Sequence, residues 1–191
     1  DAFKTLEQAE PYLDKIFGVG LDSSEVGHPP SKFERVFAKA REMGLKSFAH
    51  AGEEGPPDYV REALDLLKID RLDHGNRALE DESLVKRLRE EEIVLTSCPL
   101  SNLKLCVIED LTDSPLKTML GAGLKVTVNS DDPSYFGGYL NENYIQAAEA
   151  LGLTNEDIVT LVKNGIEGAY LSEDQKGHIL AEFETVVERH A

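Results

Sequence analysis

The chain has 191 residues, of which 41% are hydrophobic, so it can bury a substantial core as one domain or as part of a larger one. Its 36 acidic and 20 basic side chains give a formal net charge of −16, which disfavours binding to the phosphate backbone of a nucleic acid. No apolar run approaches the roughly 18 residues of a membrane span, and two cysteines are too few for a disulfide framework. We therefore expect a cytoplasmic protein that binds neither nucleic acid polymer nor membrane.

Short apolar segments alternate with amphipathic ones along the chain. Five apolar segments predict β-strands, at residues 16–22, 46–50, 71–75, 93–98 and 124–130. Segments with helical spacing of apolar residues lie around them, at residues 1–13, 32–43, 58–68, 81–91, 114–120, 141–151, 154–165 and 173–190. This alternation predicts an α/β fold with parallel strands and right-handed crossovers. Either a doubly wound open sheet or part of a (β/α)8 barrel fits the pattern.

Polar residues at the carboxyl ends of the predicted strands favour the barrel. His50, His74, Asn129, Asp131 and Asp132 all occupy such ends. In a closed barrel these ends meet at one mouth, whereas an open sheet gathers residues at a single switch point. We therefore predict a TIM (β/α)8 barrel.

A full barrel needs eight strands, and five are predicted here. We expect residues 1–191 to form a single domain, the carboxyl-terminal part of a larger catalytic barrel whose amino-terminal strands this chain lacks.

The stretch Ser47–Pro57 places His50 at a strand end and Glu53 in the following loop. A neutral imidazole can ligate a metal, and a nearby carboxylate can move a proton to or from metal-bound water. From this stretch alone, a core histidine followed by a solvated acidic loop is an equal alternative.

Three motifs in order extend the argument, namely His50-Ala-Gly-Glu53, Asp73-His-Gly75 and Ser130-Asp-Asp-Pro133. Together they resemble the adenosine deaminase superfamily of zinc-dependent purine aminohydrolases, over strands four to eight of that barrel. Two further stretches, Gly20–Phe33 and Ser97–Leu105, resemble the adenine deaminases of bacteria and fungi, which act on the free base.

The resemblance implies a reaction and a role for each residue. Adenine would be hydrolysed to hypoxanthine and ammonia, with one Zn²⁺ that His50 and Asp131 ligate. Glu53 would move a proton at the purine N1, His74 would orient and help activate the water, and Asp132 would bond the purine N7. Zinc lowers the pKa of bound water towards 7, which suits this chemistry. From the residues alone, His74 could merely end its strand, and Asp131 with Asp132 could form a turn and helix cap.

Substrate choice depends on the purine N9, which carries a proton in adenine and a ribose in adenosine. A buried N–H needs an acceptor. Alignment with the family places Glu25 where adenosine-specific members have glycine, so Glu25 could accept this N–H, with Ser24 as a helper. The alternative is a solvated loop glutamate. We predict adenine as the small-molecule partner, with adenosine deamination as the alternative function.

The sequence departs from the family in one respect. The family's first strand carries a His-x-His pair of zinc ligands, and none of this chain's five histidines are two residues apart. Two protein ligands are fewer than zinc sites use. We expect a fragment of a longer enzyme that alone binds zinc poorly and is inactive. A non-catalytic purine-binding barrel remnant without zinc is the alternative from another class.

Overall fold

The computed structural model describes residues 1–190. The chain forms two compact units, Asp1–Thr96 and Ser97–Ala191. No helix among the described residues is both long enough and apolar enough to cross a membrane.

Parallel strands form the centre of the first unit. In chain order they are β1 (Gly18–Leu21), β2 (Lys46–Ala51), β3 (Arg71–His74) and β4 (Val94–Ser97), the last ending one residue beyond the unit boundary. Each of the first three pairs in parallel with the next one along the chain. The predicted parallel arrangement is confirmed for these strands, and their ends differ from the prediction by no more than two residues.

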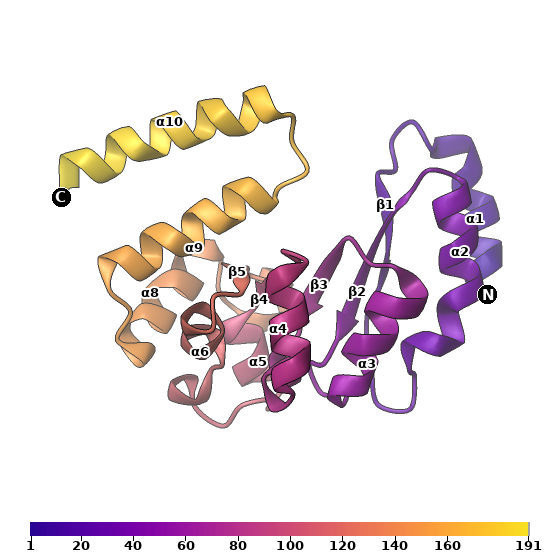
Figure 1. Ribbon diagram of the computed structural model, residues 1–191, viewed down its shortest axis with the longest axis horizontal. Helices are drawn as coiled ribbons and strands as arrows, with labels where there is room; N and C mark the ends of the chain where they lie inside the picture. Colours follow the sequence, from indigo (N-terminus) through magenta and orange to yellow (C-terminus); the bar gives the residue numbers. More distant parts are fainter. Residues whose placement is uncertain (191) are drawn as a thin grey trace. The chain divides into compact units, whose positions relative to one another are not determined.

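The helical elements of the first unit are α1 (Ala2–Ala9), η1 (Glu10–Tyr12), η2 (Pro30–Phe33), α2 (Glu34–Glu42), α3 (Pro57–Glu62), η3 (Ala63–Leu67), η4 (Asn76–Glu80) and α4 (Glu82–Glu90). Helices α2 and α3 pack against β2 (Figure 1). The helix predicted at 58–68 is in fact α3 followed by one π-helical segment, η3, and it ends at Lys68 in the left-handed conformation. The core of this unit combines small and large apolar side chains. Ala49 and Ala51 of β2 are fully buried, as are Leu67 and Leu72.

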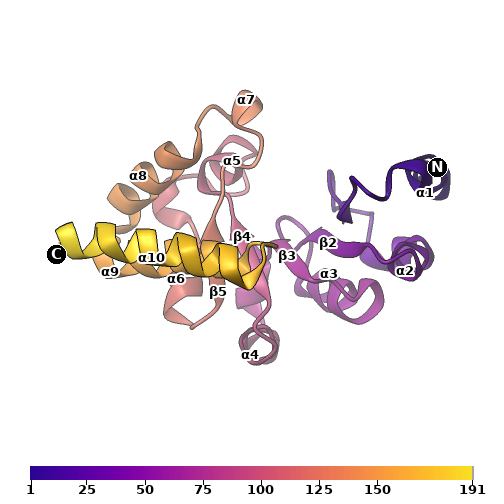
Figure 2. The ribbon, with the colours of Figure 1, turned by 90° about the horizontal axis from the view of Figure 1, so that it is seen from above.

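The second unit holds β5 (Lys125–Val128) and most of the remaining helices. These are α5 (Pro99–Lys104), η5 (Leu111–Asp113), α6 (Leu116–Gly121), α7 (Pro133–Phe136), α8 (Leu140–Leu151), α9 (Asn155–Gly168) and α10 (Glu173–His190). The Asn129 N–H, just after β5, donates to the Ser97 carbonyl at 2.8 Å, and the Asn164 side chain of α9 donates to the Val126 carbonyl at 2.9 Å. Helix α10 packs beside α9 (Figures 1 and 2).

Three short helices of this unit, α5, η5 and α7, lie outside the predicted set. Both α5 and α7 begin at a proline in the segment that follows a strand, β4 for α5 and β5 for α7. Proline suits the first helical turn, because its missing N–H is one that a helix start leaves unpaired anyway. Pro99 and Pro133 are each the first residue of their helix.

Helix α4 begins with a charged cap at Asp81. The Asp81 carboxylate accepts hydrogen bonds from the backbone N–H groups of Ser83 and Leu84, and it pairs with Arg61. Hydrogen bonds from the Arg61 side chain, the Ser83 hydroxyl and the Leu84 backbone N–H hold the pKa of Asp81 well below its usual value. A carboxyl whose pKa is lower in the folded state stabilises the fold above its unfolded pKa and loses that effect as the pH falls.

We therefore predict that Asp81→Asn weakens the acid sensitivity of the fold. The free energy of unfolding of the wild type should fall between about pH 6 and about pH 3, and the variant should show a smaller fall, because asparagine still caps the helix but cannot ionise. Urea unfolding at both pH values measures this. Asp14→Asn, at an exposed site, is the control. Equal pH dependence in Asp81→Asn and wild type would contradict the prediction.

Candidate active site

Two neighbouring strands of the first unit bring a histidine to the same edge. His50 is the second-last residue of β2, and His74 is the last residue of β3. The strands are parallel and in register, with His50 opposite Asp73 and Ala51 opposite His74. The loop Gly52–Gly55 then leaves β2 at this edge and carries Glu53.

His50, Glu53 and His74 form a compact cluster. The rings of His50 and His74 meet edge to face, with their centroids 4.7 Å apart, and Glu53 Oε1 lies 3.5 Å from His74 Nδ1. One nitrogen or oxygen from each of the three side chains lies within 4.8 Å of the others. Imidazole nitrogen and carboxylate oxygen are ligand types that zinc accepts, so the chemistry of this cluster is compatible with a zinc ion bound at His50.

Burial separates the cluster from an ordinary surface loop. His74 is 1% exposed and Glu53 is 7% exposed, while His50 is half-buried. The alternative of a solvated acidic loop after His50 is therefore wrong for Glu53. A buried carboxylate next to two imidazoles can exchange a proton with a bound molecule, as general acid–base chemistry requires.

His74 holds an unusual backbone conformation. Its φ is +65°, in the left-handed region that residues other than glycine rarely adopt, and Gly75 continues at +70°. Such strain persists where the surrounding structure holds it, and it is common at functional sites. In this conformation the His74 side chain is buried at the strand end, beside Glu53.

Glu25 lies in the same region, from the loop after β1. It is 5% exposed, so the alternative of a solvated loop glutamate is wrong. Its carboxylate accepts hydrogen bonds from the backbone N–H groups of Gly52, Glu53 and Gly55 at 3.0, 3.0 and 2.8 Å. Acceptance of a substrate N–H by Glu25 stays a prediction.

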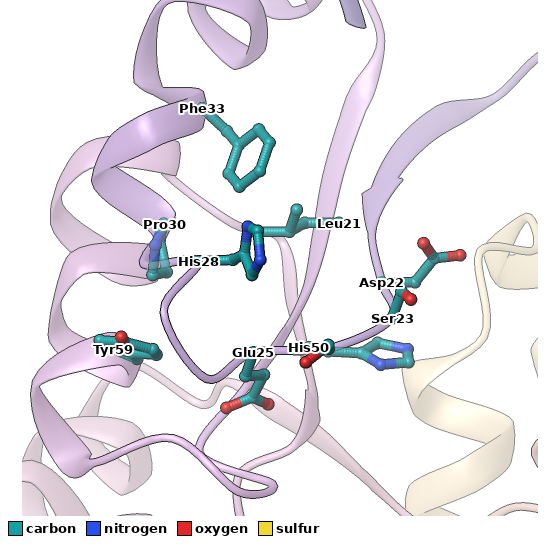
Figure 3. Close-up of a pocket in the computed structure, with 10 residues that line it drawn as sticks. Leu21, Asp22, Ser23, Glu25, His28, Pro30, Phe33, His50 and Tyr59 are labelled. Atoms are coloured by element: carbon teal, nitrogen blue, oxygen red, sulfur yellow. The ribbon is translucent and has the colours of Figure 1, made fainter.

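A cavity of about 190 Å³ opens beside His50 and Glu25 (Figure 3). Its walls combine apolar side chains with polar ones, and the lining residues are Leu21, Asp22, Ser23, Ser24, Glu25, His28, Pro30, Phe33, His50 and Tyr59. Figure 3 shows the His28 ring between Phe33 and Glu25. Ser24, a predicted helper in substrate binding, therefore lies in the cavity wall, and His28 is a lining residue that sequence patterns missed. Its place in the loop after β1, within the stretch Gly20–Phe33, was the available signal.

Asp131 and Asp132 lie in the second unit, after the carboxyl end of β5, and both are exposed. Asp131 has a φ of +56° and accepts a hydrogen bond from Ser101 Oγ at 2.7 Å. Asp132 occupies the position before α7, but its side chain makes no capping hydrogen bond. Helix capping thus does not explain the Asp132 side chain. The roles of Asp131 as a zinc ligand and of Asp132 at the purine N7 stay predictions.

Arg77 anchors the other side of the Glu53 loop. Its backbone N–H donates to the Gly52 carbonyl at 2.8 Å, and its Nη1 donates to the Glu54 carbonyl at 3.0 Å. The hydrogen bond to Glu80 raises the pKa of Arg77 above its usual value. Desolvation by burial opposes this rise, and the charges of Glu80 and Glu25 add to it. The loop is therefore held by groups that follow β1 and β3 as well as by β2.

We predict that Gly52→Ala destabilises the first unit. Gly52 has a φ of +73°, and an added Cβ would lie 2.7 Å from Val60 Cγ2. The left-handed conformation alone costs alanine about 1–2 kcal/mol, and the close contact adds to this. Chemical unfolding measures the change. Gly20→Ala is the control, because a Cβ there meets nothing within 4 Å. Equal free energies of unfolding for the two variants would contradict the assignment of strain to Gly52.

Comparison with known proteins gives consistent matches. The chain is 65% identical over 181 residues to an adenine deaminase of Sphingopyxis alaskensis, a match that covers 95% of this chain and 53% of that protein. The crystal structure of adenine deaminase from Arthrobacter aurescens is 47% identical, with a TM-score of 0.95, over 98% of this chain and 57% of that one. An amidohydrolase from Burkholderia ambifaria with bound zinc is 31% identical, with a TM-score of 0.90, over 98% of this chain and 54% of that one. The chain thus spans about half the length of these relatives.

The fold agreement confirms the predicted fold class, a portion of a (β/α)8 barrel of the metal-dependent hydrolase type. The sequence profile of the family described as adenosine deaminase matches residues 2–186. The chain therefore belongs to the adenosine deaminase family.

Proposed function

We propose that the complete protein containing this chain catalyses the zinc-dependent hydrolytic deamination of adenine to hypoxanthine and ammonia, a purine salvage reaction. The observation that carries the proposal is the buried Glu53 carboxylate beside the imidazoles of His50 and His74. The similarity to adenine deaminases, at 65% identity with that of Sphingopyxis alaskensis, supports the choice of reaction.

His50 would be a zinc ligand, since its imidazole lies at a strand end beside two further polar groups. Asp131 would be another ligand, and further ligands would come from residues outside this chain. Zinc supplies a Lewis acid that makes water nucleophilic near neutral pH. The bound zinc of the Burkholderia ambifaria amidohydrolase supports this metal.

Glu53 and His74 would carry the proton movements. The Glu53 carboxyl would donate a proton to the purine N1 as water adds to C6. His74 would orient the water, because its ring faces both Glu53 and His50. The near-complete burial of both side chains excludes bulk water from these transfers, which strengthens their interactions with the substrate.

Adenine would be preferred over adenosine. Glu25 and Ser24 line a cavity of about 190 Å³, smaller than the roughly 300–1,000 Å³ of pockets for drug-sized ligands. A free base needs less room than a nucleoside, and Ser24 or Glu25 could accept its N9 proton. Asp132 would form a hydrogen bond with the purine N7, which is an acceptor when the proton is on N9.

The setting of the enzyme completes the proposal. Residues 1–191 would belong to a single catalytic barrel in the cytoplasm, with a small purine as its partner. The acidic composition and the two cysteines support this location and argue against a nucleic acid partner.

The first test is the intact mass and bound zinc of the purified protein, followed by assays with adenine and with adenosine. We expect about one zinc per complete chain and faster turnover of adenine. Turnover of adenosine alone would replace the proposal with adenosine deamination. Purine binding without zinc or turnover would replace it with a non-catalytic role.

We further predict that Glu53→Gln lowers kcat for adenine by at least about 100-fold, because a proton donor is lost, while zinc content is unchanged. Glu54→Gln is the matched control, since Glu54 is the next residue, carries the same charge and is exposed. A Glu53→Gln variant as active as Glu54→Gln would exclude Glu53 as the proton-transfer group.

A further inference from the structure

We propose that Glu25 is a positioning residue that fixes the Gly52–Gly55 loop and thereby sets where the Glu53 side chain lies. The proposal rests on the proposed function, because the proton-transfer role of Glu53 gives the position its importance. It also makes a structural claim that can be tested without turnover.

Glu25 accepts hydrogen bonds from most of the backbone N–H groups of the Gly52–Gly55 loop. Glu25 Oε2 accepts from the N–H groups of Gly52 and Gly55, and Oε1 accepts from that of Glu53. Successive N–H groups that converge in this way form a concavity for an anion, and hydrogen bonds to a charged oxygen are stronger than neutral ones. Here the anion is a side chain of the protein itself, delivered from the loop after β1.

The carbonyl groups of the same loop are held from the opposite direction. Arg77 donates through its N–H to the Gly52 carbonyl and through Nη1 to the Glu54 carbonyl. Arg77 follows β3, the strand that ends at His74. The loop that carries Glu53 is therefore fixed by an acceptor from the β1 side and by donors from the β3 side, and Glu53 Oε1 stands 3.5 Å from His74 Nδ1.

The glycines of the loop leave room for the carboxylate. A Cβ on Gly55 would lie 2.5 Å from Glu25 Oε2 and 2.5 Å from Tyr59 Cδ2. Gly55 is therefore required for the close approach of Glu25 to the backbone. A larger residue at position 55 would displace the carboxylate without changing Glu25 itself, and this provides an independent way to break the same contact.

Steady-state kinetics, and not the number of acceptor positions, separate this role from substrate binding. A carboxylate offers about four acceptor positions, and three are taken by loop N–H groups. A positioning residue affects the rate of the chemical step through Glu53, whereas a residue that binds the base affects chiefly KM or the choice between adenine and adenosine.

The test uses the complete protein with Glu25→Gln, which keeps the side chain's size but turns an N–H donor towards the loop amides. Hydrogen exchange of the peptide that covers residues 46–59 should be at least about tenfold faster than in the wild type. The kcat for adenine should fall at least about tenfold with KM changed less than about threefold. Glu54→Gln should leave both unchanged, because it removes a neighbouring charge outside the contact.

Gly55→Ala provides the second variant. It should reproduce the faster exchange and the lower kcat, and the double variant should be little worse than either single one, because both remove the same contact. If neither variant folds, the wild type still decides: loop amides at Gly52, Glu53 and Gly55 that exchange as fast as unstructured ones overturn the proposal.

Two kinetic outcomes also overturn it. Unchanged hydrogen exchange in Glu25→Gln would show that Glu25 does not fix the Gly52–Gly55 loop. A raised KM with unchanged kcat would assign Glu25 to substrate binding instead. An inactive wild type whose loop amides depend on Glu25 would refute the proposed function while retaining the positioning role for the loop.

Discussion

The contact between the buried Glu25 carboxylate and the backbone N–H groups of Gly52, Glu53 and Gly55 determines the geometry of the first unit's site. Burying the carboxylate without these N–H groups, or the N–H groups without an acceptor, would cost free energy. A carboxylate out of water needs donors, and a backbone that has left its strand needs acceptors for its N–H groups. The loop after β2 makes its hydrogen bonds with Glu25 and Arg77 in place of strand pairing, so it can leave the sheet and remain buried.

Parallel pairing is the reason these groups can meet. The residues that follow β1, β2 and β3 all emerge at the same edge, because consecutive strands run in one direction and pair with their neighbours. Glu25 follows the first strand, Glu53 the second, and Arg77 the third. A site built this way draws one group from each crossover, and its precision depends on the register of the strands rather than on any one loop.

The residue types at strand ends were predictable from the sequence, and the hydrogen bonds between them were not. Apolar segments and their spacing identified the strands, and His50, Glu53 and His74 stood at or just beyond strand ends. Glu25, in contrast, bonds backbone amides 27 to 30 residues away, and an amide N–H carries no residue identity that a pattern could reveal. The left-handed φ of His74 was hidden for a similar reason, because local propensity disfavours it and tertiary packing maintains it.

Two buried glutamates close together therefore have different surroundings. Glu25 directs its oxygens at fixed backbone dipoles, which cannot gain or lose a proton at any working pH, so its hydrogen bonds organise structure. Glu53 directs an oxygen at the His74 imidazole, whose ring nitrogens can give or accept a proton, so its side chain is suited to proton transfer. The same loop thus presents its backbone to one carboxylate and its side chain to the cluster. Fixing the backbone is what leaves the Glu53 side chain, rather than the whole loop, to respond to a molecule bound beside it.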